Sequence, residues 1–261
     1  AMAYNKQAKF AKAYQKAYAA WNNVSVEKTF RKGGTSFEMR FIPPGRFWMG
    51  SPSGEKDRDS DEGPRHRVLL TEAYWLGKYE VTQGQWKAIM GDNPSSFDEV
   101  GDRAPVEEVS WEGCQDFCGK VGFRLPTEAE WEYGCRAGTL GPFNLGSNIT
   151  PEEVNYDGNY PYAGGSKGKY REKTVEVGSL SNANAYGLFD MHGNIYEWCS
   201  DWYEDYFGSE KIDPTGSTTG SYRVYRGGGW CNNAKFCRSA FRYWDTPGNR
   251  GSNLGFRLAS P

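Results

Sequence analysis

The sequence predicts an α+β domain in which long loops outweigh the helices and the short strands. Two features of composition favour this class. The 33 glycines suit turns with positive φ, and 10 Trp, 17 Tyr and 14 Phe supply a core of large rings. Short alternating stretches are separated by turn residues, and no repeat or low-complexity linker divides the chain. We therefore expect an N-terminal helix and lead-in over 1–30, followed by one domain over 31–261.

The segment 4–22 has the periodicity of an amphipathic helix. Four aromatic residues recur on one face, at Phe10, Tyr14, Tyr18 and Trp21. Lysines lie largely on the other face. We expect the aromatic face to pack against the domain. A helix lying on a membrane surface is the alternative, which the narrow aromatic stripe makes less favoured.

Strands are expected between Thr35 and Leu76, where apolar and polar residues alternate, and a charged loop over 54–65 interrupts them. Helices follow, each preceded by a residue that can cap its first turn, namely Thr82, Ser110 and Thr127. The last of these helices carries three glutamates, Glu128, Glu130 and Glu132. A solvated or capping role is the default expectation for such carboxylates.

Composition excludes some classes of function. The net charge of -2 gives no indication of a nucleic-acid groove. No apolar run reaches the roughly 18 residues of a transmembrane helix. The two histidines are far apart in sequence, so we expect His66 to be a surface or structural residue and His192 to be structural. Six cysteines are compatible with disulfides outside the cytosol, without requiring them, and their spacing does not suit zinc. They are Cys114, Cys118, Cys135, Cys199, Cys231 and Cys237.

Six short motifs occur in order and together resemble the formylglycine-generating-enzyme family, also called the sulfatase-modifying factor family. They are FIPPG at 41–45, GKYEVT at 77–82, PVEEVSW at 105–111, RLPTEAEWEY at 124–133, AYGLFDMHGN at 185–194 and NLGFR at 253–257. The resemblance implies a C-type-lectin-like fold that is poor in regular secondary structure. Because the family includes an oxidase and members with other roles, the fold alone does not assign a function.

One function that the resemblance implies is copper-dependent oxidation of a substrate cysteine to formylglycine. The family's enzyme uses two cysteines with four residues between them, and a serine after a double glycine. Here five residues separate Cys231 from Cys237, and Gly229 takes the serine position. In an extended segment, a shift of one residue turns a side chain to the opposite face. The pattern therefore departs from that of the enzyme, and the oxidase is kept as the alternative function.

The region 226–259 resembles the variable region of family members that diversity-generating retroelements encode. Those regions combine a fixed frame, here including Arg238 and Arg242, with diversified positions. The resemblance implies a non-catalytic, receptor-like protein whose ligand is an unidentified protein or other macromolecule. The positions assigned to the diversified, ligand-binding set are Cys231, Asn232, Asn233, Lys235, Phe236, Phe241, Tyr243, Trp244, Asp245, Thr246, Gly251 and Ser252.

Aromatic residues in this region favour a binding surface without reference to any family. They are Phe236, Phe241, Tyr243 and Trp244. Tyrosine and tryptophan offer large contact areas and have few rotamers to fix. Core packing is the alternative for any one of them. Because adjacent residues of a strand face opposite sides, we expect at least one of these rings to be exposed.

Residues 190–197 resemble a calcium loop of the family. The resemblance implies carboxylate oxygens from Asp190 and Glu197, and backbone carbonyls from Gly193 and Ile195. Hard oxygen donors suit Ca²⁺, so a structural calcium ion is expected here. An ordinary turn is the alternative interpretation.

The first three residues, Ala-Met-Ala, resemble residues introduced by cloning. We expect a preceding signal sequence or lipid anchor to have been removed from this sequence. The resemblance implies an extracytoplasmic protein displayed at the cell surface.

Overall fold

The computed structural model describes residues 2–180 and 183–261. Its helices are α1 (Met2–Trp21), α2 (Gln83–Met90), α3 (Trp111–Val121) and α4 (Glu128–Arg136), and its short 3-10 helices are η1 (Ser60–Glu62), η2 (Asp98–Val100) and η3 (Ala234–Cys237). Its strands are β1 (Glu27–Lys32), β2 (Thr35–Ile42), β3 (Gly45–Met49), β4 (His66–Leu70), β5 (Tyr74–Gly77), β6 (Tyr196–Trp202), β7 (Lys211–Ile212), β8 (Arg223–Arg226), β9 (Tyr243–Asp245), β10 (Leu254–Gly255) and β11 (Ala259–Ser260). The predicted α+β, loop-rich fold is confirmed.

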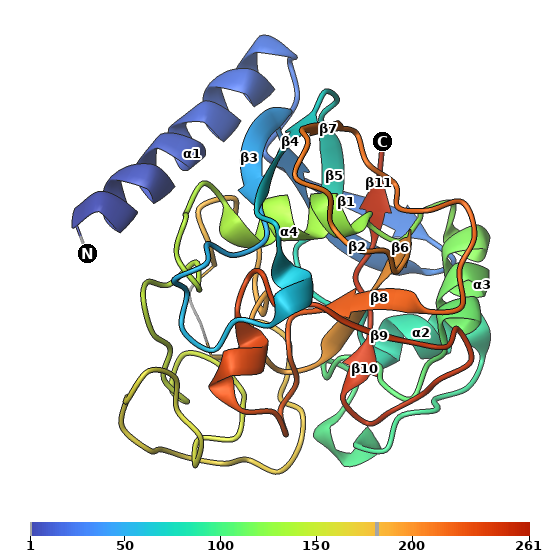
Figure 1. Cartoon of the computed structure of the whole chain (residues 1–261). Coiled ribbons are helices and arrows are strands. Elements are labelled where there is room, and N and C mark those ends of the chain that lie inside the picture. Colours follow the sequence, from blue (N-terminus) through green and yellow to red (C-terminus); the bar gives the residue numbers. More distant parts are fainter. Residues whose placement is uncertain (1, 181–182) are drawn as a thin grey trace.

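Three small sheets share the molecule, in the strand orders β1-β2-β5-β11, β10-β6-β8-β9 and β3-β4-β7. The last strand, β11, pairs antiparallel with β5, so the end of the chain closes the sheet that begins near the N-terminus. Between α4 and β6 the described residues run as long loops, which occupy the lower left of the molecule in Figure 1.

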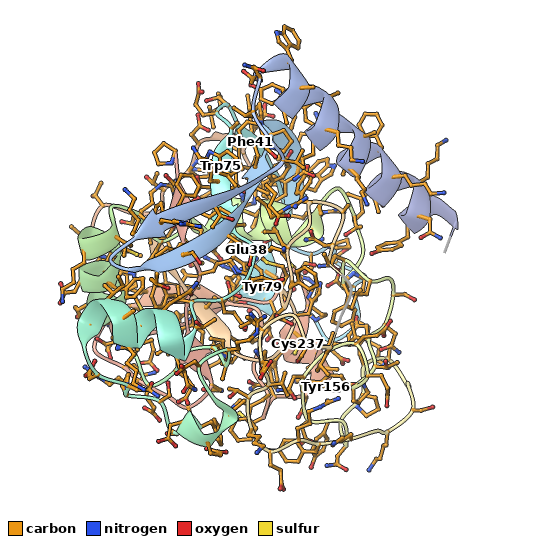
Figure 2. All side chains as sticks on the ribbon, turned by 180° about the vertical axis from the view of Figure 1, so that it is seen from behind. Glu38, Phe41, Trp75, Tyr79, Tyr156 and Cys237 are labelled. Atoms are coloured by element: carbon orange, nitrogen blue, oxygen red, sulfur yellow. The ribbon has the colours of Figure 1, made fainter. Side chains whose placement is uncertain are left out.

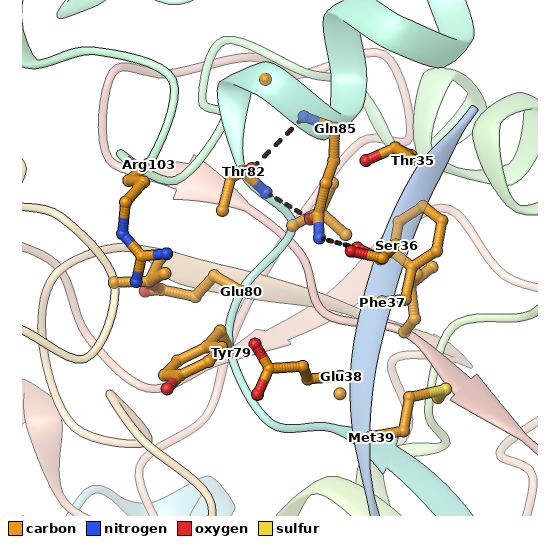
Figure 3. A pocket seen from close by; sticks show the side chains of 15 residues that line it. Thr35, Ser36, Phe37, Glu38, Met39, Tyr79, Glu80, Thr82, Gln85 and Arg103 are labelled. Atoms are coloured by element: carbon orange, nitrogen blue, oxygen red, sulfur yellow. Dashed lines mark hydrogen bonds between the residues drawn. The ribbon is translucent and has the colours of Figure 1, made fainter. Parts of the chain in front are cut away.

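The expected caps begin the helices. Thr82 Oγ1 accepts from the backbone N–H of Gln85, whose side chain accepts from Thr82 N–H. The same side chain donates to Ser36 O at 2.8 Å, which ties α2 to β2, as Figure 3 shows. Thr127 and Glu130 form an equivalent capping box on α4. These reciprocal bonds satisfy N–H groups that the first turn of a helix leaves without partners.

Large rings fill the core, as the composition predicts. Phe37, Phe117 and Phe256 are buried together with Trp86, whose ring stacks on Phe117 at a centroid distance of 5.5 Å. Phe41 lies 5.2 Å from Trp75 in the same cluster, and Figure 2 shows the two side by side.

The expectation for the N-terminal helix holds for only part of its aromatic stripe: Tyr18 packs on the core and stacks on Phe41 at a centroid distance of 6.1 Å, whereas the two ends of the stripe do not pack. Phe10 is 74% exposed and Trp21 is 85% exposed. α1 instead buries Ala11, Gln15 and Ala19. The two alanines let the helix approach the domain closely, and the Gln15 amide donates to two backbone carbonyls, Phe41 O at 2.8 Å and Tyr186 O at 2.9 Å. Buried amides are normally hydrogen-bonded, and these two bonds help to fix the helix on the domain.

No helix among the described residues is both long enough and apolar enough to cross a membrane.

Candidate ligand-binding surface

The C-terminal segment, 226–259, runs from β8 through η3, β9 and β10 with little regular structure between them. β9 is the edge strand of its sheet and pairs antiparallel with β8, so that Val224 faces Trp244 and Tyr225 faces Tyr243 in the register. These elements lie in the lower half of Figure 1, whereas α1 runs along the upper edge. What holds the irregular stretches in place is a set of buried arginines.

Arg226, at the end of β8, is fully buried and binds the segment that follows it. Its guanidinium donates to the carbonyls of Ser239 (2.9 Å), Ala240 (2.9 Å) and Phe241 (2.6 Å). Its charge is balanced by a direct ion pair with Glu132 of α4. One side chain therefore replaces the ladder of hydrogen bonds that a regular strand would supply.

Arg238 and Arg242 anchor the same stretch to distant parts of the chain. Arg238 donates to Glu62 Oε1 at 2.5 Å and to Glu55 Oε1 at 2.9 Å. Arg242 forms a two-pronged pair with Glu128, at 2.6 and 2.9 Å. All five side chains are 5% exposed or less. We call Arg226, Arg238 and Arg242, with the glutamates that bind them, the arginine frame.

The solvated or capping role expected for Glu128 and Glu132 is wrong, because both are buried in the arginine frame. Glu130 does cap its helix. A buried carboxylate is tolerated only when it is paired and hydrogen-bonded, and these guanidiniums meet that requirement. The signal was present in the sequence as three arginines in a segment of 17 residues, 226–242, together with the acidic loop 54–65.

The arginine frame presents aromatic rings at the surface. Tyr243 is 49% exposed and Trp244 is 38% exposed. Trp244 packs on Tyr222, with 4.6 Å between ring centroids, and Tyr243 packs on Tyr225 at 5.3 Å. Tyr243 and Trp244 are neighbours in β9, which is the edge strand of its sheet. Both are accessible because neither face of this edge strand is fully covered by other residues. The expectation of at least one exposed ring is therefore confirmed.

Two further residues extend this surface, and we call the set Tyr222, Phe236, Tyr243 and Trp244 the aromatic patch. Tyr222 is 40% exposed and was not predicted; it precedes β8 and has no motif to mark it. Phe236 is half-buried, and the Lys235 ammonium lies 4.7 Å from its ring centre. The patch thus combines aromatic rings with a cation at its border.

Phe241 is the exception among the residues assigned to the ligand-binding set. Its side chain is 1% exposed and packs between Phe236 (5.0 Å) and Tyr243 (6.1 Å). The expectation that it reaches a ligand is corrected: it supports the patch from below. The other assigned positions are all at least partly exposed in the structure.

Hydrogen bonds from amide groups hold a second group of the positions assigned to ligand binding, around Cys231, Asn232 and Ser252. Asn253 donates to Cys231 Sγ at 3.3 Å, and Asn232 Oδ1 accepts from Gly229 N–H at 3.0 Å. The Trp230 indole donates to Ser252 O at 2.9 Å, which joins the two ends of the loop. Asn233, Asp245, Thr246 and Gly251 complete the accessible positions. These bonds restrict the loop before any ligand arrives, which lowers the entropic cost of binding.

All six cysteines are free thiols in the structure. Burial raises the pKa of Cys237 well above that of an ordinary thiol, and burial also raises the pKa of the half-buried Cys231. Cys237 lies in the interior near Tyr156 (Figure 2), and both belong to one buried cluster. Reactive cysteines have lowered pKa values, and neither thiol has that environment.

His192 has the structural role that was expected. It is buried between Cys237 O, 2.7 Å from Nδ1, and the N–H of Asn144, 3.0 Å from Nε2. This arrangement suits the neutral ring with the proton on Nδ1, and burial lowers its pKa to about 4.

The loop assigned to calcium holds its two carboxylates in different ways. Glu197 accepts from Arg257 at 2.5 and 2.6 Å and from the Trp131 indole at 2.7 Å. Asp190 accepts from Gly178 N–H at 2.6 Å, and burial raises its pKa to about 6. No group of three or more His, Cys, Asp or Glu side chains in the described residues is arranged to hold a metal ion. Both carboxylate oxygens of Glu197 accept hydrogen bonds from Arg257, so they are not free to bind a calcium ion in this structure. Calcium binding here stays a prediction.

A separate cavity of about 240 Å³ is lined by residues of β2 and of the first turn of α2 (Figure 3), and no residue of the aromatic patch lines it. Tyr79, Glu80 and Arg103 line it. Glu80 is buried, its Oε2 accepts from Asn194 at 2.9 Å, and burial raises its pKa well above the usual range. No sequence motif pointed to this cavity.

Comparison with known proteins agrees with this architecture. The family described as the sulfatase-modifying factor enzyme 1-like domain matches residues 25–261. The chain belongs to this family. Bovine formylglycine-generating enzyme is 38% identical, over 84% of this chain and 73% of its own length. A Chlamydia caviae protein named serine/threonine-protein kinase pkn1 is 33% identical over 85% of this chain. The chain spans 38% of that protein and 53% of mouse formylglycine-generating enzyme.

Among solved structures of the family, Treponema denticola variable protein 1 is similar to this chain over 91% of its residues and 99% of that protein, with a TM-score of 0.76 and 31% identity. PvdO from Pseudomonas aeruginosa follows, with a TM-score of 0.74, 29% identity and coverage of 90% and 98%. The resemblance to the family, and to its variable proteins, is therefore confirmed. Relatives of this kind differ in their named roles, so function has to be argued from the surface of this chain.

Proposed function

We propose that this member of the sulfatase-modifying factor family is a non-catalytic binding protein whose C-terminal segment contacts a protein or other macromolecular ligand. One observation carries the proposal. Within one short segment, the arginine side chains are buried and paired with carboxylates, while neighbouring rings and amides are exposed to solvent. Enriched tyrosine and tryptophan on a rigid support are typical of binding surfaces.

The chemistry of the segment supports binding over catalysis. Copper oxidation needs accessible thiolates, whereas the Cys237 thiol is buried and both thiols of the segment have raised pKa values. Cys237 also fills space against the backbone: a Cβ placed on Gly228 would meet Cys237 Sγ at 2.6 Å. These contacts favour a packing role for this sulfur.

Receptor-like display also implies an extracytoplasmic location at the cell surface, and this location is part of the proposal.

The copper-dependent oxidase is the alternative that the test must separate, since formylglycine-generating enzymes are among the relatives. Cu(I) titration of the protein, of Cys231→Ser and of a control Cys114→Ala variant measures whether the tail thiols bind copper. Oxygen uptake on a cysteine-containing peptide measures turnover. We expect weak copper binding that is equal in all three proteins, and no peptide-dependent oxygen uptake. Tight binding that only Cys231→Ser abolishes, together with oxygen uptake, would assign the oxidase instead.

The DNA that encodes the chain gives a second test. A neighbouring copy of the region for 226–259 that differs only at adenines, next to a reverse-transcriptase gene, is the expected result. A C-terminal segment that is invariant between strains and has no such copy would remove the diversified display from the proposal.

A further inference from the structure

Helix α1 leaves two of its large aromatic side chains, Phe10 and Trp21, mostly in water. Phe10 (74%), Trp21 (85%) and Tyr14 (36%) are exposed on one side of the helix, which lies along the outside of the molecule in Figure 1. A soluble helix normally buries such rings. The family match begins at residue 25, after α1 has ended, so these rings are not needed for the fold of the family domain.

The rings of α1 continue into an apolar groove. Phe10 and Tyr14 line a groove of about 720 Å³ together with Phe47, Trp48 and Leu140. Trp48 is 39% exposed and Leu140 is 45% exposed. Helix and groove therefore form one exposed apolar surface, of the kind that marks an interaction site.

Positive charge borders this surface on both sides. α1 contains no acidic residue, and its four lysines are exposed, at Lys6, Lys9, Lys12 and Lys16. Beyond the groove, the Arg65 and Arg67 guanidiniums lie 5.5 and 5.2 Å from the centre of the Trp48 ring. Arg65 Nε and Nη2 are buried without a hydrogen-bond partner among the described residues. The chain as a whole has a net charge of -2, so this face is set apart from the rest of the molecule.

We infer that α1 and the adjoining groove bind the surface of a bilayer that contains anionic phospholipid. Aromatic rings prefer the boundary between headgroups and acyl chains, and lysine side chains extend along apolar surface while their ammonium groups reach lipid phosphates. Charge complementarity selects this partner, since an anionic bilayer attracts the four exposed lysines, whereas a neutral bilayer or an apolar protein groove gives them no such attraction. The inference does not depend on the function proposed for the C-terminal segment.

Co-sedimentation with vesicles tests the inference. We expect the protein to bind vesicles of phosphatidylcholine mixed with phosphatidylglycerol, and to bind pure phosphatidylcholine vesicles at least about tenfold more weakly. The double variant Phe10→Ala, Trp21→Ala is expected to bind the mixed vesicles at least about tenfold more weakly than the wild type. A matched control, Tyr160→Ala with Phe207→Ala, removes rings that are 56% and 58% exposed elsewhere, and is expected to bind like the wild type.

Charge is tested separately. Replacing the four lysines of α1 by glutamine is expected to weaken binding by about fivefold for each lysine removed, as raised salt also should. The control replaces four exposed lysines outside α1, namely Lys87, Lys120, Lys167 and Lys169. Equal losses in the two quadruple variants would overturn the assignment to α1. All variants are first compared by circular dichroism and Tm, so that a loss of fold is not read as a loss of binding.

A spectroscopic readout locates the contact. Brominated acyl chains quench tryptophan that enters the bilayer, and Trp21→Phe keeps the apolar ring while removing the fluorophore. We expect Trp21→Phe to bind normally but to lose part of the quenching. Three results would overturn the inference: no binding of the wild type to anionic vesicles, unchanged binding of Phe10→Ala, Trp21→Ala, or a solution dimer that this double variant converts to monomer. The dimer would assign the face to a second copy of the chain.

Discussion

Two parts of one C-terminal segment use large side chains in opposite ways. In the arginine frame, the long polar residues Arg226, Arg238 and Arg242 are buried. In the aromatic patch, the apolar residues Tyr243 and Trp244 face solvent. A simple rule that apolar residues lie inside fails at both places. The comparison indicates that the frame determines the shape of the segment, whereas the patch contributes little to it, so changes in the patch should leave the frame intact.

The largest effect is expected from breaking the arginine frame. Glu132→Ala leaves Arg226 buried with only the more distant Glu128, whose Oε1 lies 3.7 Å away, to balance its charge. The same change removes the partner of the buried Arg136, whose Nε lies 2.8 Å from Glu132 Oε1. Loss of one partner of a buried pair costs about 3–5 kcal/mol, so the free energy of unfolding should fall by at least this amount. Urea denaturation followed by circular dichroism measures it. The exposed pair Arg103 and Glu176 supplies the control, because Glu176→Ala should change stability by about 0.5 kcal/mol or less.

The next effect concerns the ring that supports the patch. Phe241→Ala should destabilise the protein by about 3 kcal/mol, because it leaves a cavity between rings that cannot close fully. The same denaturation experiment measures the change. A loss as small as that of an exposed residue would mean that Phe241 belongs to the ligand-binding set after all.

The next prediction concerns the pH dependence of stability. Glu128 and Glu132 are buried and paired with arginines, whereas the buried Asp201 has no arginine as a hydrogen-bond partner. Asp201 accepts from Glu128 N–H and from Ser200, both at 2.9 Å, and burial raises its pKa to about 7. Because the folded state holds this proton more tightly than the unfolded state, stability should fall as pH rises from about 4 to about 7, by at most about 1.4 kcal/mol per pH unit. Asp201→Asn lacks this dependence. Tm measured from pH 4.5 to 8 for both proteins tests the difference, and parallel curves would contradict it.

The smallest effect is expected from the patch itself. Tyr243→Ala and Trp244→Ala each remove a half-exposed ring, so each should lower the free energy of unfolding by about 1 kcal/mol or less. Denaturation of each variant beside Phe241→Ala gives a direct scale. If the patch variants unfold as readily as Phe241→Ala, the rings act in the core, and the comparison between frame and patch fails.

Much of the fold could be predicted because it follows local rules. Thr82 and Thr127 cap their helices through side chains three residues away, which sequence alone displays. Strand geometry predicted in the same way that at least one ring near β9 would be exposed, and both Tyr243 and Trp244 are. These features depend on neighbours along the chain, where the physical argument needs no knowledge of the tertiary structure.

The errors arose where contacts cross the molecule. Phe10 and Trp21 of α1 were expected inside but are exposed, because the helix packs through a face that includes Gln15, which donates to two carbonyl groups far along the chain. Glu132 was expected in solvent, but Arg226, 94 residues later, requires it. Both cases turn on a buried polar group whose partner is distant in sequence. The periodicity of a sequence reflects the size and polarity of residues that are near one another along the chain. It carries no information about hydrogen-bond partners that are distant in sequence.

The order in which the chain is made gives the arginine frame a consequence for folding. Arg238 lies 176 residues after Glu62 and 183 residues after Glu55, so these acids leave the ribosome long before their counter-charge exists. Until the final stretch of the polypeptide emerges, closing the interior around those carboxylates would strand them in a medium of low dielectric constant. This part of the molecule can therefore pack only after the C-terminal segment with Arg238 has been made. A prematurely terminated chain would leave Glu55 and Glu62 unpaired and the region around them unfolded.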